Sequence, residues 1–439
     1  MLNRKVVLKL HEHDISSWIP MSITMLLGMA SILDIPEIIK VLVGAIYVMT
    51  LLYLPPDESI KYLMFNLCAN ELLDIGSTSL MMIFVCLYSV MQCIQQSKSL
   101  KITTSVFLSV GLLLAMGIMV YVSFGTIQAL LDTIKHVFFL CYTAFVLKES
   151  NGEWRKLYVS VFRYIALGVM YFTALAIVKN GAASISDRFT PSEEITINFF
   201  GITCGFSIVN MIYSAMVLRE KTCTNFYLIG GCCICGLLTQ SRTFILAVAI
   251  GVVLILAFIP SMHLKFCFIM VGVLCGIVCV LAYTNIPAFE SVVNAVLGRI
   301  LKPSNGDISN GRYDLWATTI SAMMENSTYF WFGAGDYETI GAIEEGKVRV
   351  AHNLFLETWV VFGIIGCAIL VLIYILYLKQ YLLSARRNGF RMVTIAPLSV
   401  MLCCLFYSHH FIGRSMSIVF VLSFLPIAIG ISKESWEIK

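Results

Sequence analysis

Residues 244–260 read FILAVAIGVVLILAFIP, a run of seventeen positions without a charged side chain. An α-helix needs about 20 predominantly apolar residues to cross the hydrocarbon core of a bilayer. Leu264 to Tyr283 and Leu354 to Leu378 are further long apolar runs. Hydrophobic residues fill 59% of the 439 positions and charged residues only 13%, whereas soluble domains have about half and a quarter. The composition therefore excludes a soluble globular protein.

Apolar runs recur along the whole chain. They predict an all-α, polytopic membrane helical bundle of about 12 (12–14) transmembrane helices, with residues 1–439 forming a single integral membrane domain. Connections are mostly short, except for a large loop at 284–353, and no repeat of fixed period is visible. The candidate segments are 16–33, 38–55, 76–94, 103–124, 127–147, 157–178, 197–217, 225–239, 243–260, 264–283, 354–378, 394–408 and 416–431.

The distribution of Lys and Arg between short loops predicts the orientation in the membrane. The segment 379–393 carries four Lys or Arg and no acid, so we expect it to be cytoplasmic. The loop 284–353, on the other side of the helix that precedes it, carries five Lys or Arg against eight Asp or Glu and should face outward. The basic N-terminus also looks cytoplasmic, which conflicts with thirteen helices. Either one early segment does not span, or the stretch Ser59 to Leu73 holds another helix.

Several other classes of protein and site are disfavoured. The net charge of +4 comes without a basic block, so nothing indicates nucleic-acid binding. The N-terminus lacks the short apolar core and small-residue cleavage site of a removable signal peptide, so the run Ser16 to Leu33 should remain as a helix. Most of the fifteen cysteines lie inside apolar runs, which favours reduced core residues over disulfides or a metal site.

The large loop is the natural place to look for a functional site in a chain with little other polar surface. Within it, Asn310 is a suitable helix N-cap and Asp314 falls in the first turn of the helix that would follow. Arg312 would then lie beside free backbone N–H groups, an arrangement that favours an anion such as phosphate. The alternative is an arginine that pairs with Asp314 or reaches to lipid headgroups. The apolar positions of this helix would let it lie on the membrane surface, and they are Leu315, Trp316, Ile320, Met323 and Met324.

His352 is the only histidine of the loop and lies where the chain re-enters the apolar phase, with Glu357 about one turn further on. An ordinary histidine pKa near 6.5 suits a general base that takes a proton from a hydroxyl. A histidine that merely begins a helix at the interface would give the same pattern. The loop has no second histidine and no cysteine cluster, so a metal site is not expected.

Arg242 lies in a very short turn between two apolar segments, and the predicted topology places that turn on the same outward side. Arginine at a membrane boundary is often an anchor, but the positive-inside bias favours the cytoplasmic side. An arginine on the outward side therefore indicates a functional role. His409, His410 and Arg414, in the last outward turn, form a weaker group of the same sort.

The order of these motifs resembles the O-antigen ligase/polymerase superfamily over roughly 239–370. The motifs are Ser241-Arg242-Thr243, the Gly-Arg-x-x-Leu-Trp helix from Gly311 to Trp316, the Gly333-Ala-Gly335 turn, and His352-Asn353 followed by Glu357 and by Gly363-Ile-Ile-Gly366. Before residue 239 the resemblance rests on the number of helices alone. The proline that usually precedes the Gly-x-Gly turn is absent, and Tyr329-Phe-Trp-Phe stands there instead.

The resemblance implies a metal-independent glycosyltransferase of the bacterial cytoplasmic (inner) membrane that needs no cofactor. Members take a glycan from an undecaprenyl-diphosphate carrier on the outer side and join it to an acceptor hydroxyl. Arg242 and Arg312 would stabilise the diphosphate leaving group, and His352 would take the acceptor proton. The other expected substrate-binding residues are Asn353, Tyr313, Asp314, Glu357, Trp316 and Arg414. Expected partners are the lipid-linked glycan, the bilayer and a chain-length regulator protein.

Two activities of that superfamily compete, together with one function of another class. A polymerase joins lipid-linked repeat units into O-antigen, capsular or exopolysaccharide, whereas a ligase transfers a finished chain to lipid A-core, and a related branch transfers it to protein. The divergent N-terminal half and modest length favour the polymerase. A flippase for the same lipid-linked units is the third reading. It is disfavoured because the two halves of the chain are dissimilar and the notable polar residues gather at one face.

Overall fold

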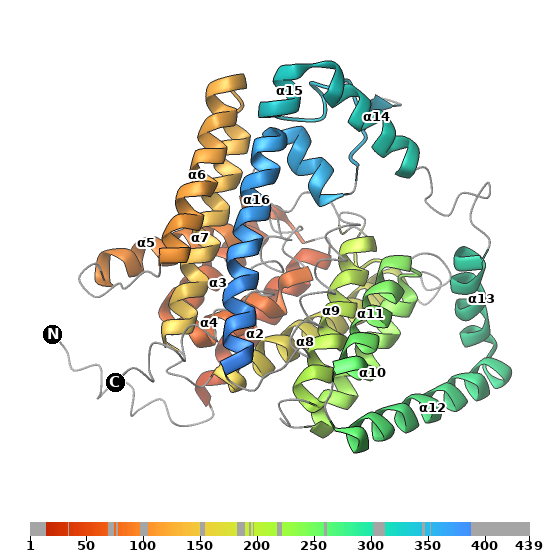
Figure 1. Cartoon of the computed structure of the whole chain (residues 1–439). Coiled ribbons are helices and arrows are strands. Elements are labelled where there is room, and N and C mark those ends of the chain that lie inside the picture. The colour runs from red at the N-terminus through yellow and green to blue at the C-terminus, as the bar shows by residue number, and fades with distance from the viewer. Residues whose placement is uncertain are drawn as a thin grey trace.

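The computed structural model is built almost entirely of α-helices (Figure 1). It describes residues 15–33, 35–68, 74–75, 78–96, 104–149, 154–181, 189–192, 195, 197–216, 222–258, 261–301, 312–344, 347–351 and 353–387. The predicted segments 394–408 and 416–431 lie outside this part of the chain, as do His352, His409, His410 and Arg414.

The first half of the chain forms helices that follow the predicted apolar segments closely. An antiparallel two-residue ladder, β1 (Asp74–Ile75) with β2 (Thr78–Ser79), follows α4 and directly precedes α5. The helices are α2 (Ile15–Ile32), α3 (Glu37–Tyr53), α4 (Pro56–Phe65), α5 (Leu80–Gln96), α6 (Thr104–Phe124), α7 (Ile127–Glu149) and α8 (Trp154–Asn180).

The second half continues with helices up to the large loop, which has helices of its own. A second two-residue ladder, β3 (Ile343–Glu344) with β4 (Lys347–Val348), pairs Ile343 with Val348. The helices are α9 (Ile197–Met216), α10 (Thr222–Leu238), α11 (Arg242–Phe258), α12 (Met262–Asn285), α13 (Pro287–Leu301), α14 (Arg312–Glu325), α15 (Ser327–Phe332) and α16 (Leu354–Arg387).

Five helices of the described part are long and apolar enough to cross a membrane. They contain Phe107–Phe124, Lys156–Asn180, Ile197–Met216, Met262–Asn285 and Leu354–Ile373. Four shorter apolar helices accompany them, within α2, α5, α10 and α11. These helices confirm the all-α, membrane-spanning class, while the expected total of about twelve spans stays a prediction.

The sequence left open whether the stretch Ser59 to Leu73 holds a further transmembrane helix, and the short helix α4 covers the first part of that stretch. Pro55 and Pro56 begin the helix, and Asp57 and Glu58 in its first turn suit the positive end of the helix dipole. Ten residues rise only about 15 Å, half the thickness of a bilayer core. Most of α4 is buried against α8, where the main chain of Phe65 leaves room only for a glycine at Gly168. Helix α4 is therefore an internal helix, too short to span.

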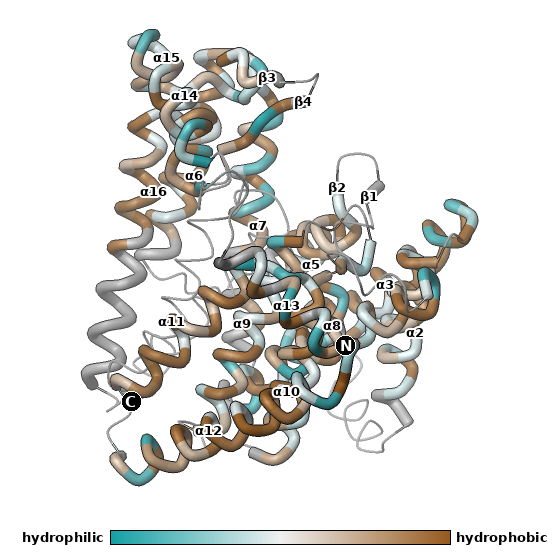
Figure 2. Tube along the Cα trace, turned by 90° about the vertical axis from the view of Figure 1, so that its right-hand side faces the viewer, coloured by the Kyte–Doolittle hydropathy of each residue, from teal (hydrophilic) through white to brown (hydrophobic). Residues whose placement is uncertain are grey.

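The main core lies around α9, which packs against α8, α10 and α11 and is buried along nearly its whole length. By contrast, α12 touches the core only near its start and is exposed along most of its length, with Phe266 and Leu274 more than half accessible. A helix that is apolar all round and exposed suits a lipid environment. Figure 2 shows α12 as a mostly hydrophobic tube at the edge of the molecule, and polar stretches lie around α14 and β3 among other places.

The cysteines bear out part of what their positions predict. All of those that the structure describes are free, so the described residues contain no disulfide. Cys68, Cys204, Cys232 and Cys235 are buried core residues as expected. Cys279, inside the predicted apolar run 264–283, is exposed instead, so the prediction of a core position is wrong for this residue, and Cys223 is exposed as well.

Candidate functional site

The large loop builds a small hydrophobic core of its own, separate from the core of the helical body. Its buried members are Met323 of α14, Tyr337 and Ala351 of the connecting segments, and Val360 of α16. Trp316 and Trp359 pack against them from the edge. This core divides the apolar face predicted for α14, because Met323 is buried whereas Ile320 and Met324 stay exposed.

Two side chains hold Ala351, the residue directly before His352, by both of its main-chain polar groups. The indole Nε1–H of Trp316 donates to the carbonyl oxygen of Ala351 at 2.6 Å. The N–H of Ala351 donates to the hydroxyl of Tyr337 at 3.3 Å. Ala351 and Tyr337 are both buried, so each bond replaces a contact with water that the fold has removed. The chain is therefore fixed one residue ahead of the predicted base.

On the other side of position 352, Asn353 begins α16. Its side-chain oxygen accepts the N–H groups of Phe355 at 3.0 Å and Leu356 at 3.3 Å, which is how an asparagine caps a helix. This bonding gives Asn353 a structural role, and its predicted contact with substrate stays a prediction. Positions 351 and 353 are thus both held by hydrogen bonds that nothing in the sequence pattern alone specifies.

Glu357 lies one turn into α16 and is almost completely buried, with 1% of its surface exposed. Its carboxylate is near the hydroxyl of Tyr337. Burial raises the pKa of Tyr337 well above its usual value, and the charge of Glu357 raises that pKa further. Tyr337 therefore stays protonated at every physiological pH and remains able to donate as well as accept. Acidic side chains are rarely buried this deeply without a partner or a function.

The first turn of α14 carries three of the predicted residues. Arg312 is half-buried at the first helical position, Asp314 is exposed, and Tyr313 is exposed to 66%. The ring of Tyr313 meets the ring of Trp316 edge to face, with centroids 5.6 Å apart. The structure thus confirms that a helix begins at this motif. Trp316 of that helix links it to Ala351 by the hydrogen bond described above. Asn310 and Gly311, the predicted cap, lie outside the described residues.

The two glycine motifs meet at a bend within α16. Gly363 has φ 71° and ψ −177°, a conformation that breaks the helix there. Gly333 (φ 88°) lies against it, and a Cβ on either glycine would collide with main-chain atoms of the other segment. Beside them the N–H of Ala334 donates to the carbonyl of Val360 at 2.6 Å. The Gly-x-Gly turn therefore docks main chain to main chain on the Gly363-Ile-Ile-Gly366 motif.

The bend is sharp enough to fold the start of α16 back beside its own continuation. The thiol of Cys367 lies 3.3 Å from the carbonyl oxygen of Phe355, although twelve residues of straight helix would separate them by about 18 Å. Figure 1 shows the short first part of α16 turning away from the long second part near α15. The single apolar run 354–378 therefore contains a buried first segment, Leu354 to Phe362, and a separate longer helix.

Arg242 begins α11, after a turn that is buried on all sides. Gln240 has a positive φ of 51°, and Ser241 accepts the N–H of Phe244 at 3.5 Å, so this serine caps the helix. Arg242 itself is half-buried. Since α11 leads down into α12, the turn lies at the opposite, upper end of the pair in Figure 1, on the side that carries α14 and α15. The start of α11 is therefore at the end of that helix that is nearer to α14 and α15 in this view.

The structure brings together Trp316, Asn353 and Glu357 with Tyr337, which sequence reasoning missed. Arg242 and Arg312 stand at the starts of other elements, α11 and α14, and His352 and Arg414 lie outside the described residues. Tyr337 had no signal of its own beyond following the Gly-x-Gly turn. The described residues hold no group of three or more His, Cys, Asp or Glu that could bind a metal ion.

A second group that was missed lies on α7, inside the predicted apolar segment 127–147. Asp132 Oδ1 accepts the amide of Gln128 at 2.9 Å and the ammonium of Lys135 at 3.3 Å. The sequence did carry a signal for it, because ionisable residues within a membrane segment are costly and indicate function by default.

Comparison with known proteins adds one finding. Residues 227–371 match the family model described as O-Antigen ligase. This range confirms the superfamily resemblance expected for residues 239–370, and it holds every described residue of the group around Ala351. No curated protein is significantly similar to the chain.

Proposed function

We propose that this chain, whose residues 227–371 match the O-antigen ligase family model, is a membrane glycan polymerase. It joins undecaprenyl-diphosphate-linked repeat units into O-antigen, capsular or exopolysaccharide on the outer face of the bacterial inner membrane. The observation that carries the proposal is the match itself, because its range contains Arg242, Arg312 and the hydrogen-bonded group on either side of His352.

The proposed division of labour follows the chemistry of the reaction. Transfer of the glycan leaves two negative charges on the lipid diphosphate, and fixed guanidinium groups stabilise such charge where it develops. Arg242 and Arg312 have this role. The acceptor hydroxyl must lose its proton as its oxygen attacks the anomeric carbon, and His352 takes it. Trp316, Tyr337 and Asn353 keep the main chain around His352 in place.

Because arginines supply the positive charge, the reaction needs no divalent metal. Polymerisation in proteoliposomes should therefore continue in excess EDTA. If chelation stopped the reaction and magnesium or manganese restored it, the roles given to Arg242 and Arg312 would be wrong. A chain-length regulator protein is the partner expected to set how far polymerisation runs.

A ligase that transfers the finished chain to lipid A-core is the second candidate, and the name of the matched family, O-Antigen ligase, favours it. A deletion strain separates the two. Loss of a polymerase leaves a single repeat unit on the lipid A-core, whereas loss of a ligase leaves none while lipid-linked polymer accumulates. A flippase would change neither the length nor the attachment of a glycan when purified protein is given lipid-linked units in proteoliposomes.

A further inference from the structure

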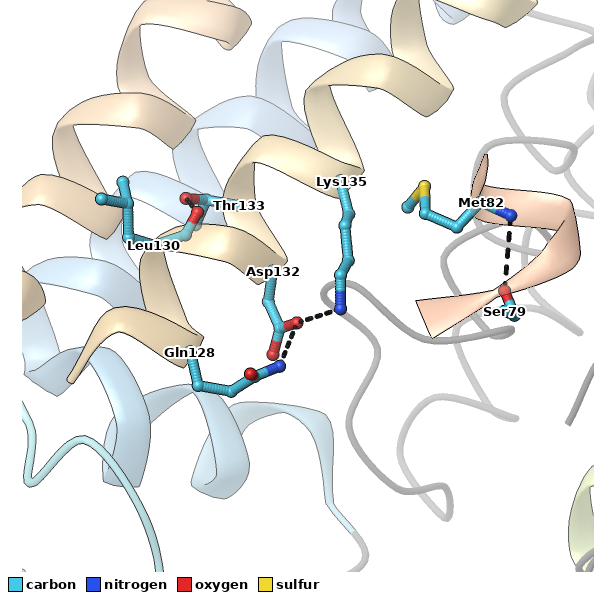
Figure 3. Close-up of polar contacts among 7 residues, drawn as sticks. All are labelled: Ser79, Met82, Gln128, Leu130, Asp132, Thr133 and Lys135. Carbon is cyan, nitrogen blue, oxygen red and sulfur yellow. Dashed lines mark hydrogen bonds and ion pairs between the residues drawn. The ribbon is translucent and has the colours of Figure 1, made fainter. Parts of the chain in front are cut away.

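Helix α7 carries a ladder of polar side chains on one face of its first half (Figure 3). Gln128, Asp132 and Lys135 follow one another at spacings of four and three residues, so they share one face of the helix. The carboxylate of Asp132 accepts from both neighbours. Among the described contacts Gln128 and Lys135 make one polar bond each, although an amide and an ammonium can make several.

We propose that this ladder, Gln128, Asp132 and Lys135, binds sugar hydroxyl groups of the acceptor glycan. The proposal rests on the proposed glycosyltransferase function and gives it an acceptor subsite. Nothing in the motifs of residues 239–370 extends to α7, so the subsite lies outside the region that the resemblance covers.

The surroundings of the ladder make a purely structural ion pair costly. Helix α7 lies antiparallel beside α6, a helix that can cross the membrane, and the two are joined only by Gly125 and Thr126. Charged groups in a membrane bundle generally lie in its interior or in a hydrated path rather than against lipid. The side chains of Asp132 and Lys135 are 18% and 14% exposed, so the pair is neither sealed in the core nor open to the bulk. This partial access suits a face that a polar ligand reaches.

The ladder begins close to the candidate site and extends away from it along α7. Thr126, just ahead of the first turn of α7, is the residue that a Cβ on Gly335 would meet, at 2.7 Å from its Oγ1. Gln128 follows two residues later. On the other side, α7 packs against α5, and Figure 3 shows Lys135 on the side of α7 that faces Ser79 and Met82 at the start of α5. A glycan lying along the ladder would therefore end at the Gly-x-Gly turn of the catalytic loop.

The chemistry of the ladder distinguishes a sugar from a phosphate. The opposite charges of Asp132 and Lys135 cancel, and the carboxylate would repel a phosphate or diphosphate. A sugar hydroxyl both donates and accepts, so it can donate to the carboxylate or to the amide oxygen of Gln128 and accept from the ammonium of Lys135. The three groups extend over about 10 Å of helix, room for one to two sugar rings.

The first test measures binding of the repeat-unit oligosaccharide released from the surface polysaccharide of the same strain. Purified protein in nanodiscs should bind it, and Gln128→Ala and Asp132→Asn should each raise the dissociation constant about tenfold or more, as expected for lost hydrogen bonds, one of them to a charged group. Glu37→Gln, which alters another acid–lysine pair spaced by three residues, is the matched control and should leave binding unchanged. Gln128 is exposed, so its replacement should not disturb folding.

A second test locates the ligand. Gln128→Cys and Val122→Cys, each three residues from Gly125, are compared in a background without other reactive thiols. Val122 is 77% exposed on the apolar face of α6. The oligosaccharide should slow thiol labelling at position 128 and not at 122, and inorganic pyrophosphate should slow neither. Protection of position 128 by pyrophosphate would replace the glycan with a phosphate ligand and overturn the proposal.

The outcomes separate this inference from the function on which it rests. If the wild-type protein polymerises while both ladder variants bind and polymerise normally, the acceptor subsite is wrong and the polymerase stands. If the oligosaccharide binds at Gln128 but no lipid-linked unit is ever joined to another, the polymerase is wrong and the glycan site stands.

Discussion

The proposed role of Arg312 can be tested by comparing two replacements, one that keeps the positive charge and one that removes it. A guanidinium binds a phosphate through two parallel hydrogen bonds, whereas an ammonium keeps the charge but loses that geometry. We expect Arg312→Lys to retain a small part of the polymerising activity and Arg312→Ala much less, with both variants reaching the membrane at wild-type levels because Arg312 is outside the packed core. Activity with purified lipid-linked units checks this. Equal activity in the lysine variant and the wild type would exclude a bidentate role.

His352→Ala should lower turnover by roughly two to four orders of magnitude, the usual worth of a general base. Donor binding should hardly change, since the proposed base acts on the acceptor. Single-turnover kinetics and a donor-binding assay separate the two effects. An active His352→Ala variant, or one that is lost from the membrane, would make the histidine structural.

The bonds to Ala351 predict an effect that depends on single polar atoms. Trp316→Phe keeps an aromatic ring but leaves the buried carbonyl of Ala351 without its indole donor, at a cost of about 1–3 kcal/mol. We expect turnover to fall about tenfold while the Michaelis constant for the donor stays the same. Trp331→Phe, on a ring that is 52% exposed, is the control and should behave like the wild type. A Trp316→Phe variant with unchanged turnover would mean that the bond to Ala351 does not position the site.

The sequence was informative about these residues only where a motif named them. Arg312, Trp316 and His352 stand out because they are polar or aromatic groups at fixed spacing in a loop. Tyr337 does not, because its importance comes from a hydrogen bond to Ala351, fourteen residues later. Such a bond depends on how the Gly-x-Gly turn docks, which no local pattern encodes.

At the scale of elements, the contact between Gly333 and Gly363 holds the large loop against α16. Gly363→Ala would put a Cβ into the main chain of Trp331 and Gly333 and would force a positive φ on an alanine. Strain of this kind costs about 1–3 kcal/mol before the collision is counted. We expect a clear loss of thermal stability and of activity. Gly276→Ala is the control, since a Cβ there meets open space, and it should not lower stability.

The helices themselves were largely predictable, since apolar length and the loop boundaries decide them. Predicted segments such as 103–124 and 197–217 agree with α6 and α9 to within a residue. The bend in α16 was not predictable from hydropathy, because Leu354 to Phe362 is apolar for packing in the loop core and the following residues are apolar for spanning. Packing in the loop core and spanning the membrane both select apolar residues, so hydropathy cannot distinguish the two segments.

At the scale of the whole molecule, the orientation of the loop 284–353 is a prediction that one label can check. A cysteine at Ser304, which lies outside the described residues, should react with a membrane-impermeant maleimide in intact spheroplasts when other reactive thiols are absent. The physical reason is the positive-inside bias. The segment 379–393 carries four Lys or Arg and no acid and should stay inside, whereas the loop carries five Lys or Arg against eight Asp or Glu and lies across the helix from it. Labelling only after lysis would place the loop, and the candidate site, in the cytoplasm.

The fold-back of α16 has a consequence for how the protein is made. During insertion the machinery meets 354–378 as one apolar stretch, long enough to be threaded straight across the membrane. The finished molecule instead has Leu354 to Phe362 folded back beside the following helix and docked on the Gly-x-Gly turn. Biogenesis should therefore include a maturation step after insertion, in which this segment leaves its first position. Pulse-chase labelling of Phe355→Cys would reveal the step as a change of thiol reactivity with time, and constant reactivity from the first minute would exclude it.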